Sequence, residues 1–503
     1  MKTRSFFKWL MLAALGTGLA PVAALAQDKP IVIQNQRELF VDDYLVEKLD
    51  KMEARLGVPA SGGKAIVLDK PWEGRFGLAG AVVNAEGLFK MYYRGLPGTS
   101  ETTPSHNCYA ESVDGIHWTK PSLRQVEYNG SLENNIIKEA SHTVMYDEKP
   151  GVPYRQRYKT LKGNSKTGLY VMVSGDGFRW KRLDENPDLV GVGKGHALDS
   201  PNILAWVPAE NQYAIYMRDW TGFTLGAPTP KEPNEFGNIH PFYHGVRTLM
   251  RSTSTDLIHW TEPVRMTFGN TPLEHFYTNA TQAYFRAPHI LIAMPMRYNP
   301  DWNSNVMSEA ELKAAGIHPV QWMGVSDVVL LTSRGGNTFD RKFVESFVRP
   351  GLSQQNWGAR SQISALGIIP TGPGEISFFV TRGYATKEAF IERMTLRTDG
   401  FVALHAGFAE GSATTKPLSL RGNTMELNYC SSPIGYVKVL LLDEAGRELP
   451  GFGLADAVAI RGDKIDGKVK WKSGKTVHDL GEKKVRIKFV AKDADIYSFG
   501  IFD

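Results

Sequence analysis

Short runs that alternate apolar and polar residues fill most of the chain from about residue 65 onwards. Segments such as LFKMYYRG (88–95) and QYAIYMRD (212–219) change face at every residue, which is typical of β-strands with one buried face. Gly, Pro and Asn separate these runs, as they do in the turns between antiparallel strands. The pattern predicts an all-β protein.

A short motif, Ser/Thr-x-Asp-Gly-x-x-Trp, recurs after pairs of these runs. Its clear and fainter copies lie at 111–121, 173–183, 252–263, 332–343 and 396–406. The spacing of roughly 60 to 80 residues is close to that of a propeller blade with inserted loops. Five such units predict a five-bladed β-propeller over residues 65–407.

Two further segments flank the predicted propeller. Residues 408–503 contain strands in a different rhythm without the motif, which predicts a C-terminal β-sandwich. Residues 27–64 are expected to close the ring or to wrap around it. A string of independent sandwiches is the alternative, but no linker rich in Pro, Ser or Gly separates the units.

The motif has either a structural or a functional interpretation. Its Asp can accept hydrogen bonds from turn amides, its Gly can adopt a left-handed conformation, and its Trp can pack between sheets. Five identical active sites in one ring would be unusual, so a structural role is favoured. The motif resembles the Asp-box of sialidase-type propellers, which lies on the face opposite the active site. The Phe-Arg-Ile-Pro motif of sialidases is missing.

The N-terminal residues 1–26 form a basic start, an apolar stretch and a small-residue end, Ala24-Leu25-Ala26. This layout predicts a signal peptide cleaved before Gln27, and therefore a periplasmic or secreted protein. No later segment is apolar and long enough to span a membrane. The net charge of +5 is mild, and no Lys/Arg block suggests a nucleic-acid partner.

The two cysteines, Cys108 and Cys430, are far apart in the sequence. An oxidising compartment permits a disulfide, but separate, buried thiols are favoured. The cysteine pattern supports neither a thiol nucleophile nor a zinc site. No cofactor and no metal ligand set is predicted, although a structural calcium ion at the propeller axis stays open. The oligomeric state is not predicted.

Candidate site residues are expected where the innermost strands begin, because these strand ends converge on the propeller axis. The residues at those positions are Glu73, Arg75, His142, Asp199, Glu274, Tyr277, Asn279, Asn356, Trp357 and Arg360. Carboxylates, a histidine, aromatic rings and arginines are the residue types of a polar active site. A purely structural ring would place apolar residues or Gly there.

Arginines also end the second strand of four of the five units, and these ends should open onto the same face. They are Arg94, Arg218, Arg297 and Arg382. Guanidinium groups bind carboxylates and sulfates through two parallel hydrogen bonds. The arginines therefore suggest an anionic sugar substrate, unless they pair with the catalytic acids or with strand ends.

Paired carboxylates in such a funnel suit cleavage of a glycosidic bond, which needs a proton donor and a second carboxylate. Glu274 is the expected general acid, and Asp199 the base, nucleophile or stabiliser. The third acid is Glu73 or one of the pair Asp42 and Asp43. A further candidate, Asp219, follows Arg218.

Several segments resemble a known family. ELFVDDYLV (38–46), YTNATQAY (277–284), RPGLSQQNWGAR (349–360) and KDADIYSFGIFD (492–503) are similar to exported bacterial proteins related to glycoside hydrolase family 32. The resemblance implies a five-bladed propeller with a β-sandwich, and three acidic residues around the axis. The Trp-x-Asn-Asp-Pro-Asn-Gly motif of family 32 is missing, so fructan specificity is not implied.

The expected function is a secreted glycoside hydrolase that acts on a poly- or oligosaccharide, with carbohydrate as its partner. A polysaccharide lyase is the first alternative, with His142 or Tyr277 as base and arginine to neutralise a uronate. A non-catalytic carbohydrate-binding propeller is the second. The sugar, the linkage and the stereochemical outcome are not predicted.

Overall fold

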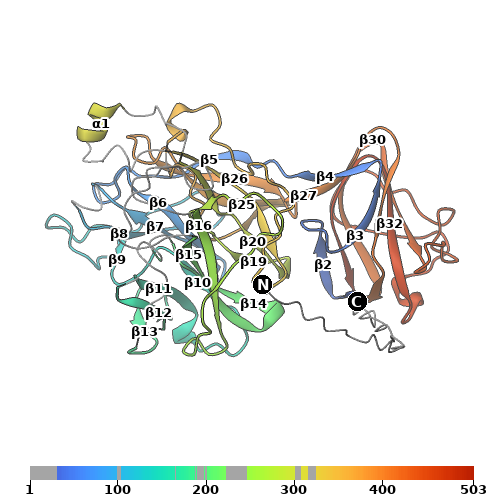
Figure 1. The fold of residues 1–503 in the computed structure, drawn as a ribbon, viewed down its shortest axis with the longest axis horizontal. Coiled ribbons are helices and arrows are strands. Elements are labelled where there is room, and N and C mark those ends of the chain that lie inside the picture. The colour runs from blue at the N-terminus through green and yellow to red at the C-terminus, as the bar shows by residue number, and fades with distance from the viewer. Residues whose placement is uncertain are drawn as a thin grey trace, which may run out of the picture.

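The computed structural model describes a set of ranges in the chain: 31–98, 103–164, 166–186, 188–189, 198, 201–221, 246–300, 308–314, 324–358 and 360–503. Their secondary structure is mostly strand, which confirms the predicted all-β fold. Figure 1 shows a larger body of radiating sheets on the left and a smaller sandwich on the right. The expected signal peptide, 1–26, lies outside the described residues.

Four of the five blades are four-stranded antiparallel sheets. Blade 1 contains β6 (Leu78–Ala85), β7 (Leu88–Gly95), β8 (His106–Ser112) and β9 (Ile136–Ile137). Blade 2 contains β10 (Val144–Tyr146), β11 (Tyr158–Asn164), β12 (Gly168–Ser174) and β13 (Lys181–Arg182). Blade 3 contains β14 (Ile203–Val207), β15 (Gln212–Thr221), β16 (Val246–Ser254) and β17 (Val264–Arg265).

Blade 4 is divided into two three-stranded sheets. One contains β18 (His275–Phe276), β21 (Met296–Asn299) and β22 (Val325–Val328). The other contains β19 (Gln282–Tyr284), β20 (Ala287–Ala293) and β23 (Leu331–Ser333). A short helix, α1 (Glu309–Ala314), lies between β21 and β22 in the sequence.

Blade 5 closes the ring with a strand from the other end of the chain. It contains β24 (Ile369–Gly372), β25 (Glu375–Arg382), β26 (Phe390–Arg397) and, as its outermost strand, β5 (Ala60–Val67). β26 pairs with β5 in antiparallel register. This pairing leaves no free edge on β26, so the closed ring hides a strand that would otherwise be open to association.

The innermost strands surround a common axis. Residues of β6, β10, β14, β19 and β24 together line one pocket at the end of that axis. Ala81 of blade 1 also bridges to Leu366 of blade 5, which brings the first and last blades together. The predicted five-bladed propeller is thereby confirmed. Between the blades, apolar side chains such as Val144, Ala205 and Leu291 are buried in a continuous core.

The sandwich combines strands from both ends of the chain. Its C-terminal strands are β27 (Val402–Ala406), β28 (Gly411–Thr415), β29 (Leu418–Arg421), β30 (Thr424–Leu442), β31 (Asp463–Lys468) and β32 (Lys484–Phe502). Its N-terminal strands are β1 (Ile31–Gln34), β2 (Gln36–Leu39), β3 (Val46–Asp50) and β4 (Met52–Leu56). Of the segment 27–64, which was expected at the propeller, the described strands before β5 thus pair within the sandwich.

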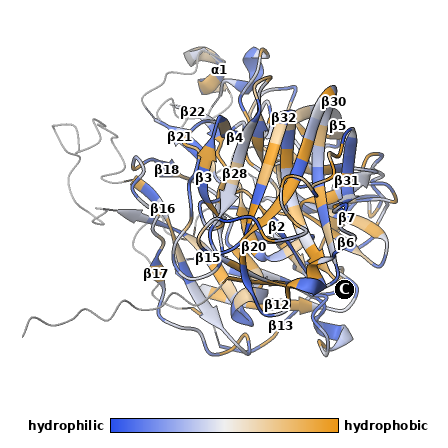
Figure 2. Cartoon of the chain, turned by 90° about the vertical axis from the view of Figure 1, so that its right-hand side faces the viewer, coloured by the Kyte–Doolittle hydropathy of each residue, from blue (hydrophilic) through white to orange (hydrophobic). Residues whose placement is uncertain are grey.

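The long strands β30 and β32 form the centre of the sandwich, and Figure 2 shows that they carry hydrophobic and hydrophilic residues in alternation. Their inward-facing residues bury an apolar core around Phe489 and Phe499. Four short 3₁₀ helices complete the secondary structure: Tyr154–Gln156, Pro208–Glu210, Gln354–Asn356 and Val477–Leu480. Among the described residues, we find no helix with the length and apolar character of a membrane span.

Candidate active site

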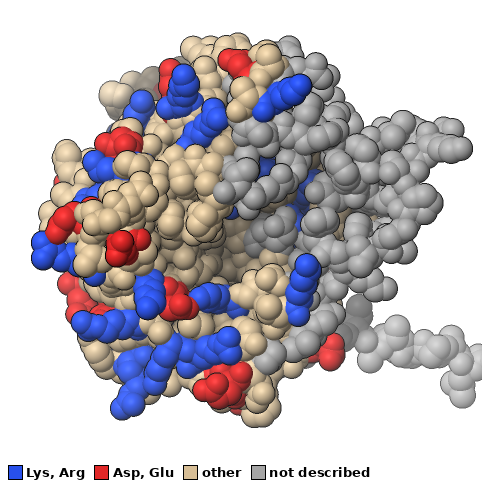
Figure 3. Space-filling model, turned by 90° about the vertical axis from the view of Figure 1, so that its left-hand side faces the viewer, with Lys and Arg blue, Asp and Glu red and all other residues tan. Residues whose placement is uncertain are grey.

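The innermost strands begin at the face of the propeller where the second strands end. Leu78 at the start of β6 pairs with Arg94, and Phe276 in β18 pairs with Arg297. We call this end of the propeller the front face. Viewed from the side that points away from the sandwich, the molecule has a hollow near its middle with Lys and Arg atoms around it (Figure 3).

Three guanidinium groups surround the ring of Tyr277 at the front face. The Cζ atoms of Arg218, Arg247 and Arg360 lie 4.8, 5.0 and 5.8 Å from the ring centroid. Arg218 is 1% exposed and Arg247 is 4% exposed. The backbone N–H of Arg247 donates to Nδ1 of His275 at 3.2 Å, so this ring nitrogen is an acceptor. The cluster concentrates positive charge around one phenol, where low solvent exposure makes charges act strongly.

A second group of buried side chains at the front face consists of Arg94 from blade 1 and His142 from blade 2. Arg94 donates to the carbonyl oxygen of Phe76 at 3.2 Å and to the hydroxyl of Tyr384 at 3.3 Å. The Nε atom of Arg94 and the Nε2 atom of His142 are buried and have no hydrogen-bond partner among the residues that the structure describes. Burial, together with the charge of Arg94, lowers the pKa of His142 to about 3. At neutral pH the imidazole is therefore uncharged.

Glu274 lies between two arginines. Arg297 Nη1 contacts its carboxylate at 3.0 Å, and the buried Arg341 contacts its other oxygen. Arg297 also binds Asp327 through two hydrogen bonds of 2.9 and 2.6 Å. Glu274, Arg297 and Asp327 line a pocket of about 690 Å³ whose wall includes Trp357. The carboxylate of Glu274 is thus held in place from two sides by guanidinium groups.

Arg382, Asn279 and Asp219 are tied into the blades. The Nε atom of Arg382 donates to Glu392 at 2.6 Å, and the whole side chain is 4% exposed. Asn279 is 1% exposed, and its amide donates to a backbone carbonyl at 3.4 Å. Asp219 binds the exposed Arg265 through Nε at 3.0 Å. These hydrogen bonds hold neighbouring strands together and occupy the side chains of all three residues.

Glu73 and Asp43 also differ from the roles expected of them. Glu73 is fully buried, accepts a hydrogen bond from Tyr93 and pairs with Lys120 at 2.8 Å. This closed network is that of a structural ion pair. The side chain of Asp43 is 83% exposed and pairs with Lys342 beside the sandwich. Both carboxylates thus form their ion pairs with lysines.

The remaining predicted residues, Arg75, Asn356 and Trp357, are held by a ring contact or by hydrogen bonds to the backbone. The Cζ atom of Arg75 lies 5.4 Å from the Phe76 ring, so its guanidinium packs on an aromatic side chain. Trp357 is 36% exposed, and its indole N–H donates to the carbonyl oxygen of Gly351 at 2.8 Å. This bond fixes the ring in the wall of the pocket. The side-chain amide of Asn356 donates a hydrogen bond to the carbonyl oxygen of Pro350 at 3.0 Å, which helps to hold the same segment.

Asp199, the second predicted catalytic residue, lies outside the described residues. Sequence reasoning also missed several residues that the structure brings to this site, namely Arg247, His275, Asp327, Arg341 and Tyr384. Arg247 is the second residue of β16, the third strand of its blade, which begins on the front face. A search of the third-strand starts, like the search of the second-strand ends, could have found it. Arg341 and Tyr384 have no such signal, because they arrive from outer strands and loops.

Within the described ranges, no group of three or more His, Cys, Asp and Glu side chains could hold a metal ion. Cys108 and Cys430 are both free thiols.

Comparison with known proteins gives distant structural likenesses. No family model and no curated protein matches the chain. A glycoside hydrolase family 43 arabinoxylan arabinofuranohydrolase from Bacillus subtilis is 10% identical, with 88% of this chain and 99% of that chain covered and a TM-score of 0.38. A β-fructofuranosidase from Schwanniomyces occidentalis is also 10% identical, with 88% and 97% covered and a TM-score of 0.40. A chain described as a glycoside hydrolase is 11% identical, with 68% and 92% covered and a TM-score of 0.41. With identities and TM-scores this low, these likenesses do not decide the function.

Proposed function

We propose that the protein is an exported glycoside hydrolase whose saccharide substrate carries carboxylate or sulfate groups. The observation that carries the proposal is the gathering of guanidinium groups from several blades at the front face. Arg94, Arg218 and Arg247 lie there beside aromatic rings, as an anionic sugar requires. Export is proposed from the predicted signal peptide.

The donors of Arg94 and His142 favour an anionic ligand further. Buried polar atoms are almost always hydrogen-bonded, and both the Nε of Arg94 and the Nε2 of His142 lack a partner among the described residues. A ligand oxygen could accept from the guanidinium Nε. The neutral imidazole can donate or accept according to its tautomer.

Two carboxyl groups are needed for the cleavage itself. Glu274, which Arg297 and Arg341 hold at the edge of the pocket, is the candidate that the structure describes. Together with Asp199 it is proposed as the pair of carboxyl groups.

A β-eliminating lyase is the second candidate, and the surroundings of Tyr277 favour it. The Cζ atoms of three guanidinium groups lie within 5.8 Å of its ring centroid, so the phenol stands beside cations of the kind that bind a uronate carboxylate. The uncharged His142 is a second group able to accept a proton. Such an enzyme would act on a uronate, whose carboxylate an arginine can neutralise.

The test is a screen of purified uronate-containing, sulfated and neutral polysaccharides, with product analysis. A hydrolase releases reducing ends without new ultraviolet absorbance, whereas a lyase creates an absorbing unsaturated sugar. Lack of cleavage of every anionic polymer, or cleavage restricted to neutral ones, would contradict the proposal.

For an anionic substrate we expect Arg94→Ala to raise KM about tenfold to a hundredfold, because a charged hydrogen bond is lost. Arg179→Ala is the matched control, since its side chain is 91% exposed on a motif turn of blade 2. Equal KM values for Arg94→Ala and the control would remove Arg94 from the site.

A further inference from the structure

The propeller has a second cavity at the end of its axis opposite the front face. This rear pocket has a volume of about 580 Å³ and is lined by residues of all five innermost strands. At Phe285 and Pro370 it meets another pocket of about 720 Å³, which extends to Asp463 and Asp466 on the sandwich strand β31. Since the two pockets share these residues, they form one depression. We call it the rear groove.

Two buried polar groups in the wall of the rear pocket have no hydrogen-bond partner among the described residues. The amide oxygen of Gln282 accepts the N–H of Ile368 at 3.1 Å, which fixes the orientation of the amide. Its Nε2 is buried without an acceptor in that part of the chain. The same is true of the hydroxyl of Thr281, a fully buried residue. Because buried polar groups are nearly always hydrogen-bonded, a ligand hydroxyl or a water in the pocket is a fitting partner for them.

Aromatic side chains flank these donors. Phe285, in the turn between β19 and β20, is 46% exposed where the two pockets meet. Tyr146 and Trp206 are half-buried in the wall of the rear pocket. Aromatic rings beside a few fixed polar groups are a typical arrangement for binding a small organic ligand in a cleft. Sugar rings present both C–H faces and hydroxyl groups to such a surface.

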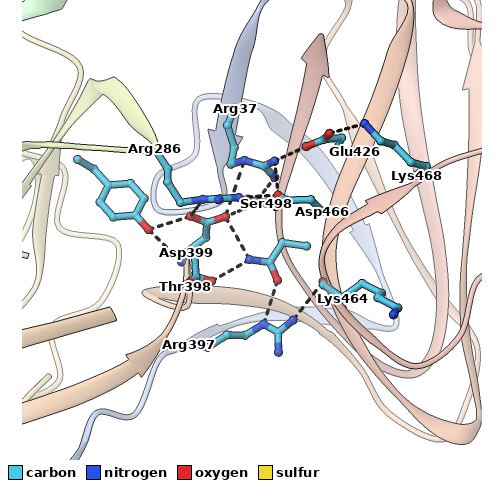
Figure 4. A network of polar contacts seen from close by, with 12 residues as sticks. Arg37, Arg286, Arg397, Thr398, Asp399, Glu426, Lys464, Asp466, Lys468 and Ser498 are labelled. Atoms are coloured by element: carbon cyan, nitrogen blue, oxygen red, sulfur yellow. Dashed lines mark hydrogen bonds and ion pairs between the residues drawn. The ribbon is translucent and has the colours of Figure 1, made fainter. Parts of the chain in front are cut away.

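Two ion pairs lie at the sandwich end of the rear groove. Arg286 binds Asp466 at 2.7 Å (Figure 4). Arg397 binds Asp463 at 2.6 Å. These pairs still offer oxygen and nitrogen atoms to ligand hydroxyls. With Asp147, Glu148 and Lys149 of the rear pocket, the groove has four acidic and three basic residues in its lining, so it has no surplus of positive charge that would attract an anion. This separates the rear groove from the front face, where guanidinium groups gather around Tyr277.

We propose that the rear groove is a non-catalytic binding site for a neutral segment of a saccharide chain. The choice of saccharide rests on the proposed function, whereas the case for a hydrogen-bonding ligand rests on Gln282 and Thr281. A site on the opposite face from the catalytic funnel would hold the polymer without blocking its cleavage.

Binding of cellohexaose and xylohexaose, measured by titration calorimetry, tests the proposal. We expect at least one of them to bind, and Phe285→Ala to weaken that binding about tenfold through the loss of ring contact. Phe408→Ala is the matched control, because Phe408 is 69% exposed on the sandwich. It should bind like the wild type.

A second variant tests the unpaired donors. Gln282→Glu keeps an oxygen for the N–H of Ile368 and removes the amide donors, so it should also weaken binding. Arg94→Ala, at the front face, should leave hexasaccharide binding unchanged.

No binding of either hexasaccharide would overturn the proposal, as would equal binding by Phe285→Ala and Phe408→Ala. Loss of binding in Arg94→Ala would place the ligand at the front face and overturn it too. Binding that depends on Phe285 in a protein without any cleavage activity would contradict the proposed function alone.

Discussion

His142 shows how one side chain takes its chemical state from the fold. The residue lies at the start of the inner strand of blade 2, and its backbone carbonyl is so close to Gly80 that a Cβ there would lie 2.1 Å from the oxygen. Burial beside Arg94 lowers the pKa of the imidazole. The sequence placed His142 at the front face, but its uncharged state depends on a neighbour from another blade.

This pKa predicts a pH dependence of stability. Between the unfolded value of 6.5 and the folded value of about 3, the unfolded chain binds a proton that the folded protein does not. Stability therefore falls as the pH falls through this window, by about 1 kcal/mol per pH unit from this group. His142→Gln should lose less stability than the wild type between about pH 7 and about pH 5. The thermal unfolding midpoints of both proteins, measured across this pH range, check the prediction. Equal decreases of the midpoint in the variant and the wild type would contradict it.

At the scale of the element, the repeated motif forms a self-contained turn. The carboxylate of Asp114 accepts the backbone N–H groups of Ile116 and His117, each at 2.8 Å. A bond from the His117 ring, with these amides, holds the pKa of Asp114 well below its usual value. Asp176 and Asp256 accept the equivalent bonds in blades 2 and 3. The structural role favoured from the sequence agrees with this geometry.

The degenerate copy in blade 4 is completed by a neighbour. Here Gly335 and Gly336 replace the Asp-Gly pair, and the N–H of Gly336 donates to the carboxylate of Glu210 from blade 3. Gly335 has a φ of 109°, a conformation that favours glycine. Sequence comparison of the copies could not reveal this substitute carboxylate, because it comes from another unit.

The turn predicts a defined effect of Asp256→Ala. Two backbone N–H groups would lose their acceptor, as at a helix cap, so we expect a loss of about 1 kcal/mol in stability with unchanged KM and kcat. Asp50→Ala, on the exposed side of β3, is the control with no expected effect. Calorimetry and steady-state kinetics measure the two quantities. A fall in kcat without a fall in stability would indicate chemistry in the motif.

At the scale of the whole molecule, Asp399 of the fifth motif joins the propeller to the sandwich. Its fully buried carboxylate accepts hydrogen bonds from Tyr284 at 2.8 Å and Arg286 at 3.1 Å in blade 4. From the sandwich, Ser498 donates at 2.6 Å and Asn428 at 3.1 Å (Figure 4). One carboxylate thus connects strands that are far apart in the sequence.

Removal of this carboxylate should therefore weaken the contact between the two bodies. Asp399→Ala removes the acceptor of the four hydrogen bonds and leaves Arg286 with only the more exposed Asp466, so we expect a loss of about 3 kcal/mol. Asp463→Ala removes a partner of Arg397 that is 62% exposed, so its loss should stay below about 1 kcal/mol. Calorimetry of both variants gives the comparison. Equal losses would show that the buried network does not stabilise the junction.

The sequence by itself determined the all-β class, the five units and the structural use of the repeated turn. These features depend on neighbouring residues: alternation sets which side of a strand is buried, and the Asp of the motif bonds to amides two and three positions later. Arg94, Arg218 and Arg297 could be found for the same reason, since the ends of the second strands are visible in the pattern.

The tertiary structure alone decided which charged groups meet. Glu73 pairs with Lys120, Asp43 pairs with Lys342, and Glu274 lies between Arg297 and Arg341. It also decided that β1 to β4 pair within the sandwich while β5 closes the ring. The physical reason is that an ion pair or a strand pairing depends on which distant segments pack together, and local alternation carries no record of that choice.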